Sequence, residues 1–175
     1  MTPEYNKSTG KLELLTYDSN GDGKPDMWST MDGARVIKIQ VDKDFDGTPD
    51  RWEYYDANQR IEKIGFSRLN DGKEDAWSYT GASGVITRIE VSLKRDGKVQ
   101  RIEHYTDGKL ASAEEDTDAD GRMDKWETYS GDRLAMVAFD TTRRGTPDRR
   151  LVYGPNGSAR VEIDPEGDGT FVPSK

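Results

Sequence analysis

The sequence predicts an all-β fold, a repetitive antiparallel β-meander of about seven 24-residue units, each running strand, tight turn, strand and acidic loop. Three observations predict it. An Asp-Gly pair recurs at a nearly constant interval, aromatic and alternating apolar segments follow each pair, and no segment has a helical period. The same alternation is also compatible with a parallel β-solenoid, which stays open as an alternative.

One glycine in each acidic loop defines the repeat. Successive copies are 24 or 25 residues apart, so we expect a single repeat domain over residues 1–175. The glycines are Gly23, Gly47, Gly72, Gly97, Gly121, Gly145 and Gly169. Units begin near residues 18, 42, 67, 92, 116 and 140, with partial units at 1–17 and 164–175.

The first strand of each unit is predicted by aromatic residues, which favour strands. Tryptophan recurs at one position and tyrosine three residues later. These residues are Trp28, Trp52, Trp77 and Trp126, then Tyr55, Tyr105, Tyr129 and Tyr153. Turns such as Asp32-Gly33 and Asp107-Gly108 follow, and their residues accept the positive φ of hairpin turns.

The second strand alternates between apolar and polar residues, as in Ile37, Ile39 and Val41, and a period of two indicates a half-buried strand. Tight turns favour the meander over the solenoid, because parallel strands need long crossovers. We expect the acidic loops along one edge of the sheet. We also expect tryptophan and the Ile/Val positions to share its buried face, with Tyr55 and its equivalents on the other.

Composition limits the function classes. Hydrophobic residues make up 32% and charged residues 34%, so a thick two-layer core is not expected. The net charge of −8 argues against nucleic-acid binding, which needs clustered basic residues. The longest apolar run, Leu134–Phe139, is far too short for a membrane span. The chain has no cysteine, which excludes disulfides and thiolate metal ligands.

The acidic loops have the spacing of a cation-binding loop. Oxygen side chains fall at positions one, three, five and nine, glycine at six, and position seven offers a backbone carbonyl, as Ca²⁺ requires. Three loops are complete. Their predicted ligands are Asp18, Asn20, Asp22, Lys24 and Asp26 in loop 1 (18–26), Asp42, Asp44, Asp46, Thr48 and Asp50 in loop 2 (42–50), and Asp116, Asp118, Asp120, Arg122 and Asp124 in loop 5 (116–124). Lys24, Thr48 and Arg122 would contribute their carbonyls.

The other loops lack part of this set. Loop 3 (67–75) keeps two acids, loop 4 (92–100) has lost the site, and loop 7 (164–172) ends on Val172. Loop 6 (140–148) has Arg144 at position five, and we expect this guanidinium to replace the metal by pairing with Asp140 or Asp148.

Glutamate at position twelve invites comparison with the EF-hand, whose loop ends in a bidentate glutamate. Glu53 and Glu127 occupy this position after loops 2 and 5. The complete loop 1 is followed there by Ser29, however, and the incomplete loop 4 by Glu103. Glutamate at position twelve is thus absent after one complete loop and present after an incomplete one. We therefore expect it not to bind metal.

Two segments resemble known families. The loop Asp18-Ser19-Asn20-Gly21-Asp22-Gly23-Lys24-Pro25-Asp26 resembles the calcium-binding hairpin loops of integrin α-subunit propellers and bacterial FG-GAP repeats. The segment Asp50-Arg51-Trp52-Glu53-Tyr54-Tyr55-Asp56-Ala57-Asn58 is similar to MORN-type strand pairs. The resemblance implies calcium in the loops and a single-layer meander. It does not imply a propeller, whose blades need about four strands between loops.

These features predict a non-enzymatic, calcium-stabilised scaffold or adhesion module with about three Ca²⁺ sites. An accessory part of a carbohydrate-active or other hydrolytic enzyme and a calcium buffer are the alternatives. No catalytic or cofactor-binding residue can be nominated. The one histidine, His104, stands where other units have Tyr54 or Tyr79, and no phosphate-binding or nucleophile motif is present.

Location and partners follow from this hypothesis. We expect an extracellular, periplasmic or cell-surface protein, where Ca²⁺ is millimolar. The tyrosine positions suggest a protein or carbohydrate partner. Both ends of the sheet are expected to be open, so that copies of the chain could pair into a homopolymer. Neither nucleic acid nor a membrane span is expected.

Overall fold

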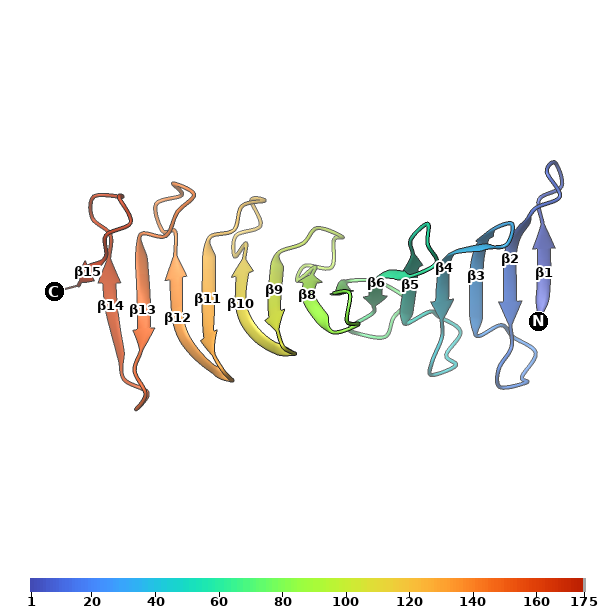
Figure 1. The fold of residues 1–175 in the computed structure, drawn as a ribbon, viewed down its shortest axis with the longest axis horizontal. Coiled ribbons are helices and arrows are strands. Elements are labelled where there is room, and N and C mark those ends of the chain that lie inside the picture. Colours follow the sequence, from blue (N-terminus) through green and yellow to red (C-terminus); the bar gives the residue numbers. More distant parts are fainter. Residues whose placement is uncertain (175) are drawn as a thin grey trace. The chain divides into compact units, whose positions relative to one another are not determined.

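The computed structural model describes residues 1–174 and has fifteen strands and no helix within them (Figure 1). The strands are β1 (Thr2–Tyr5), β2 (Leu12–Tyr17), β3 (Met27–Asp32), β4 (Arg35–Val41), β5 (Arg51–Tyr55), β6 (Ile61–Phe66), β7 (Ala76–Thr80), β8 (Ile86–Val91), β9 (Arg101–Thr106), β10 (Lys109–Glu115), β11 (Lys125–Ser130), β12 (Arg133–Phe139), β13 (Arg149–Tyr153), β14 (Ala159–Ile163) and β15 (Val172–Pro173). The all-β prediction is confirmed. The described chain contains no helix that could serve as a transmembrane span.

The chain forms two compact units. The first comprises Met1–Thr80 with Arg95–Gly97 and holds β1 to β7, and the second comprises Gly81–Lys94 with Lys98–Lys175 and holds β8 to β15. Within each unit strand order follows chain order, and neighbouring strands pair antiparallel. The meander is therefore confirmed, and the parallel solenoid is wrong.

Tight turns and acidic loops alternate along each unit. The turns are as short as the sequence predicts: Thr106 pairs with Lys109 across a two-residue connection. Asp107 and Gly108 in that turn have φ of 51° and 74°, the left-handed region that Asp and Gly accept most readily. Because every other connection is an acidic loop, all acidic loops of one unit lie at the same end of its strands (Figure 1).

The strand register corrects the predicted faces of the sheet. Trp52 in β5 lies opposite Gln40 of β4, whereas Ile39 lies opposite Glu53. Directly opposed residues share a face, and neighbours along a strand point to opposite faces. Trp52 and Ile39 therefore lie on different faces, and the expectation that they share one is wrong. Tyr55, two residues beyond Glu53, lies on the Ile/Val face and not opposite it.

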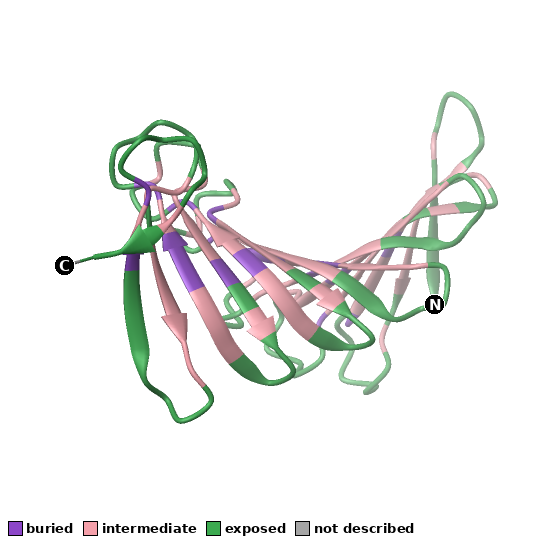
Figure 2. Ribbon diagram, turned by 60° about the vertical axis from the view of Figure 1, so that its left-hand side comes forward, coloured by how far each residue is buried: buried purple, intermediate pink, exposed green. Residues whose placement is uncertain are grey.

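The second unit has the same arrangement. Trp126 lies opposite Ala138, whereas Val137 lies opposite Glu127. The two faces are named here the tryptophan face and the Ile/Val face. In the described chain only five hydrophobic side chains are buried, namely Trp52, Ala76, Ala113, Val137 and Ala138. Buried residues accordingly form short stretches within half-buried strands (Figure 2), and the prediction of a thin core is confirmed.

A glutamate organises the tryptophan face of the first unit. Glu74 accepts hydrogen bonds from Trp77 Nε1 at 2.6 Å and from the Tyr54 hydroxyl at 2.7 Å. Its carboxylate lies over Gly65, where an added Cβ would be 2.0 Å from Glu74 Oε1. Gly65 stands opposite Trp52, which is only 6% exposed. Because Gly65 has no side chain, the Glu74 carboxylate has room to lie beside the tryptophans.

Charged residues replace apolar packing on the Ile/Val face of the second unit. Arg101 contacts Glu103 at 2.8 Å, Glu115 at 3.0 Å and Glu127 at 2.9 Å. Lys125 lies 2.8 Å from Glu127. Because these side chains lie on adjacent strands with their aliphatic stems half-buried, the network both joins β9, β10 and β11 and covers the sheet.

Removing the best-buried tryptophan should strongly destabilise the first unit. We expect Trp52→Ala to cost about 3–5 kcal/mol in the free energy of unfolding, because a large buried side chain leaves a cavity. Leu69→Ala is the control, since Leu69 is 66% exposed and its loss should cost less than about 0.5 kcal/mol. Urea denaturation followed by far-UV circular dichroism measures both. Equal effects would contradict the burial of Trp52.

The charged network should make stability depend on pH. Burial alone would raise the pKa of Glu127, but hydrogen bonds from Lys125, Arg101 and Tyr129 lower it from 4.5 to about 2. A lowered folded-state pKa gives stability that is complete above pH 4.5 and is lost as the pH falls toward the folded value. At pH 7 we expect Glu127→Gln to cost about 2 kcal/mol.

The difference between wild type and Glu127→Gln should shrink between pH 4.5 and about pH 2, where the wild-type carboxylate takes up its proton. Urea denaturation at several pH values gives this difference directly. Glu62→Gln serves as the control, because Glu62 is exposed. A difference between wild type and Glu127→Gln that is independent of pH would rule out the predicted pKa.

Candidate metal centres

In every acidic loop except loops 3 and 4, which begin with serine, the aspartate at position one closes the loop onto its glycine. In loop 2, Asp42 Oδ2 accepts a hydrogen bond from the Gly47 N–H at 2.8 Å, and Gly47 has φ of 95°. The same bond is made by Asp18 with Gly23 (2.9 Å), Asp116 with Gly121 (2.8 Å), Asp140 with Gly145 (2.6 Å) and Asp164 with Gly169 (3.0 Å). Because this backbone conformation strains any residue with a Cβ, the recurring glycine has a structural cause.

The aspartate at position nine ties the loop to its own start. Asp50 Oδ2 accepts a hydrogen bond from the Lys43 N–H at 2.7 Å, and the Asp50 N–H donates to the Val41 carbonyl at 2.9 Å. Asp148 does the same with Thr141 in loop 6, at 2.7 Å. Loop 6 is incomplete as a cation site and yet keeps the bond between Gly145 and Asp140 and the bond between Thr141 and Asp148. Positions one and nine therefore shape the loop whether or not an ion binds there.

The structure brings carboxylates together in the three loops that the sequence singles out. In each, one oxygen from each of three aspartates lies within 4.8 Å of the other two. The groups are Asp18, Asp22 and Asp26 in loop 1, Asp42, Asp44 and Asp50 in loop 2, and Asp116, Asp118 and Asp124 in loop 5. Each group could hold a metal ion.

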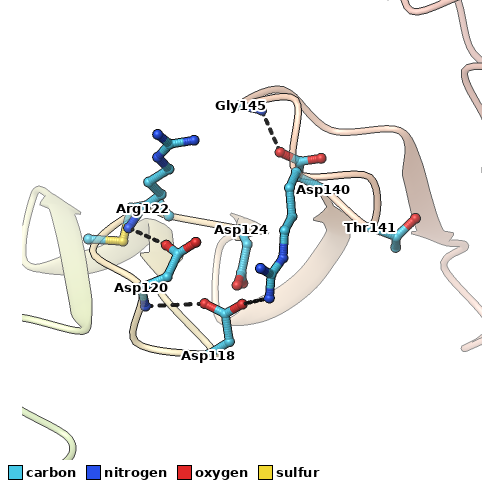
Figure 3. Close-up of a pocket in the computed structure, with 9 residues that line it drawn as sticks. Asp118, Asp120, Arg122, Asp124, Asp140, Thr141 and Gly145 are labelled. Atoms are coloured by element: carbon cyan, nitrogen blue, oxygen red, sulfur yellow. Dashed lines mark hydrogen bonds and ion pairs between the residues drawn. The ribbon is translucent and has the colours of Figure 1, made fainter.

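Some predicted ligands lie outside these groups. Asp46 Oδ1 accepts the Thr48 N–H at 2.8 Å, and Asp120 Oδ1 accepts the Arg122 N–H at 2.9 Å (Figure 3). In loop 1, Asn20 Oδ1 accepts the Asp22 N–H at 2.8 Å. Lys24, Thr48 and Arg122 stand two residues after position five, and their N–H groups donate to its carboxylate.

One oxygen in loop 2 has no hydrogen-bond partner. Asp42 is 2% exposed, and while its Oδ2 bonds to Gly47, its Oδ1 is buried and makes no hydrogen bond among the described residues. A buried carboxylate oxygen without a partner carries an uncompensated desolvation cost. Since Asp44 and Asp50 lie beside it, a cation bound to this group would supply the missing interaction.

Hydrogen bonds hold loop carboxylates in the charged form that cation binding needs. The Ser19 hydroxyl, 2.7 Å away, lowers the pKa of Asp26 from its ordinary value. The Thr48 hydroxyl, 2.6 Å away, does the same for the pKa of Asp46. Both loops are therefore negatively charged at neutral pH and suited to cations.

Loop 3 holds an arginine among its acids. Arg95 Nε lies 2.5 Å from Oδ2 of Asp75, which is fully buried, and the same guanidinium contacts Asp71. The bond from Arg95 lowers the pKa of Asp71 to about 2. Arg68 Nε also lies 3.3 Å from Asp75. No sequence pattern links Arg95 to loop 3, because 20 residues separate it from Asp75.

Loop 6 differs from the expectation. Its Arg144 does not pair with Asp140 or Asp148 through its side chain; the guanidinium lies 2.7 Å from Asp164 of loop 7. Only the backbone N–H of Arg144 reaches Asp140, at 3.1 Å. The predicted replacement of a metal within one loop is wrong, because the arginine is long enough to reach the acid of the neighbouring loop.

The glutamates at position twelve lie in strands. Glu53 bonds to Arg51 at 2.9 Å and to the Tyr55 hydroxyl at 2.8 Å. Glu103, which follows an incomplete loop, makes the same pair of bonds with Arg101 and Tyr105 at 2.8 and 2.9 Å. These bonds are part of the Ile/Val face. They also occupy the tyrosine hydroxyls that we expected to serve partner binding.

A small pocket of about 80 Å³ lies where loop 5 meets loop 6 (Figure 3). Asp118, Asp120 and Asp124 line one side, and Asp140 and Gly145 line the other. His104 belongs to none of the three carboxylate groups found in the described chain; it is half-exposed on β9, with its Nε2 3.3 Å from Glu114 Oε1.

Comparison with known proteins identifies no family. No protein-family model matches the chain, and no curated protein matches it. Among solved structures, a GtfA/B complex bound to UDP and GlcNAc matches at 13% identity and TM-score 0.44, over 59% of this chain and 22% of that one. A complex of accessory secretory proteins 1, 2 and 3 from Streptococcus pneumoniae matches at 17% identity and TM-score 0.32, over 72% and 20%. The chain thus spans about a fifth of each protein's length.

The stability that loop 3 contributes should depend on Arg95 and not on a bound metal ion. We expect Arg95→Gln to lower the melting temperature by several degrees, to the same extent in calcium and in chelator, because the fully buried Asp75 loses a charged partner. Arg60→Gln is the control, since Arg60 is 76% exposed beside Asp56 and should have almost no effect. A loss that calcium restores would contradict the assignment.

Proposed function

We propose that this protein is a non-enzymatic repeat scaffold or binding module whose acidic loops are stabilised by Ca²⁺. The ions would occupy loops 1, 2 and 5, each with its group of three aspartates. The observation that carries the proposal is the buried Asp42 Oδ1, which has no hydrogen-bond partner among the described residues. Two further carboxylates of loop 2 lie beside it.

The chemistry of the loops favours calcium over magnesium. Every predicted ligand is a hard oxygen, and the ligands are spread over the nine residues of each loop. Ca²⁺ accepts about six to eight such ligands in irregular geometry, whereas Mg²⁺ demands a near-ideal octahedron and keeps several waters. Asp46, Asp120 and the position-seven carbonyls would complete the coordination after local rotation of their side chains or peptide units.

Bound ions would contribute a large share of the folding free energy of such a thin sheet. With five buried hydrophobic side chains in the described chain, the free energy of folding has little apolar burial to draw on. A ligand at about 100 times its dissociation constant adds about 2.7 kcal/mol per site. Millimolar calcium outside the cytoplasm would supply this ratio at micromolar affinity, so we place the protein in an extracellular, periplasmic or cell-surface setting.

The proposal predicts a metal count and a stability change. Calorimetric titration of the full chain with CaCl₂ should give about three ions per chain, one for each group of three aspartates. Melting in excess EDTA should occur at a lower temperature than in calcium, because only the folded loops bind the ion. An unchanged melting temperature together with no binding heat would sink the proposal.

Substitution of a buried ligand locates one of these sites. We expect Asp42→Asn to remove about one ion from the stoichiometry while the other two sites still bind, since a neutral amide replaces the carboxylate. Asp107→Asn is the matched control: it makes the same charge change in a tight turn at the other end of the strands. Loss of an ion from Asp107→Asn as well would show that net charge, not loop 2, holds the metal.

A further inference from the structure

The fourth residue of every acidic loop has a left-handed backbone. The values of φ are 79° at Gly21, 63° at Phe45, 54° at Asn70, 56° at Arg95, 61° at Ala119, 60° at Arg143 and 75° at Gly167. Five of these seven residues are not glycine, and a left-handed conformation costs them about 1–2 kcal/mol each. The loop therefore fixes the direction in which position four projects, whatever its side chain.

Position four projects toward the preceding loop. Asn70 of loop 3 donates from its amide to Asp44 Oδ2 of loop 2. Arg143 of loop 6 contacts Asp118 of loop 5. Arg95 contacts Asp71 and Asp75 of loop 3. All three polar side chains at position four thus contact aspartate carboxylates of the preceding loop.

Neighbouring loops are also in direct contact. The Ser67 N–H of loop 3 donates to the Asp50 carbonyl of loop 2 at 3.0 Å. Gly72 of loop 3 also lies against Thr48 of loop 2, since a Cβ added to Gly72 would be 3.2 Å from the Thr48 Cβ. These contacts bring the start of loop 3 against the carboxylate group of loop 2. The side chain of Asn70 is therefore held close to that group.

The acids touched by position four include candidate metal ligands. Asp44 and Asp118 each belong to a group of three carboxylates. Loop 2 also contains the buried Asp42 Oδ1, which makes no hydrogen bond within residues 1–174. An amide beside such a group can present its oxygen by rotation about its last side-chain bond, because nitrogen and oxygen exchange places. A guanidinium has only donors and carries positive charge, so it can only compete with the ion.

We propose that the cation site of loop 2 is completed by Asn70 from loop 3, and that position four of the following loop sets the cation affinity of each acidic loop. The proposal rests on the proposed calcium binding. Arg95 takes the place of the ion in loop 3, and Arg143 opposes it in loop 5. Loop 1 is followed by Phe45, which carries neither a ligand nor a charge. The three sites therefore bind calcium unequally, loop 2 most tightly and loop 5 most weakly.

Glycine substitutions test this without backbone strain, because glycine adopts positive φ freely and already stands at position four as Gly21 and Gly167. In calorimetric calcium titrations of the full chain, Asn70→Gly should weaken one site about tenfold through loss of a ligand. Arg143→Gly should tighten the weakest site about three- to tenfold through loss of a competing charge. The reciprocal variant Asn70→Arg should abolish or strongly weaken one site.

Matched controls lie at the end of the strands that carries the tight turns. Asn58→Gly and Arg133→Gly remove the same side chains at the opposite end of the strands and should leave all three affinities unchanged. Asn70→Asp, which keeps an oxygen at this place, should bind at least as tightly as wild type and separates loss of a ligand from misfolding. Three bound ions with affinities unchanged in Asn70→Gly and Arg143→Gly would overturn the inference and leave calcium binding intact. No binding in wild type would overturn both.

Discussion

The structure depends on the aspartate that begins every acidic loop except loops 3 and 4, which begin with serine, because its carboxylate accepts a backbone N–H group of the loop. Asp42 and its equivalents accept the N–H of a glycine five residues on, and this bond reverses the chain between two strands. A left-handed glycine is the residue that permits the reversal. Since the bond is present in complete and incomplete loops alike, the repeat keeps its shape when its cation ligands are lost.

Around these loops lies a sheet that has little apolar core to rely on. On the tryptophan face of the first unit, Glu74 accepts hydrogen bonds from Trp77 and Tyr54. On the Ile/Val face of the second unit, ionic contacts such as that between Arg101 and Glu127 join neighbouring strands. Each strand is stabilised mainly by its neighbours, as in other linear repeats. The ordered conformation of the loops therefore contributes strongly to the stability of the protein.

Each acidic loop also has to offset the repulsion among its own carboxylates. In loop 3 a guanidinium from position four of the next loop lies against Asp75. In loop 2 the buried Asp42 Oδ1 has no hydrogen-bond partner among the described residues. The fixed charge of loop 3 thus meets the electrostatic need that a bound cation would meet in loop 2 under the proposed function.

The repeat, the strands, the tight turns and the three loops with grouped carboxylates could all be predicted from the sequence, because spacing along the chain sets them. The lateral pairing of the strands sets which side chains share a face, since a shift of register by one residue moves Trp52 and Ile39 to opposite sides. It also sets the partners of Asn70, Arg95 and Arg144, which are acids of neighbouring loops. Contacts between loops depend on how strands pair laterally, and a one-dimensional pattern carries no information about that distance.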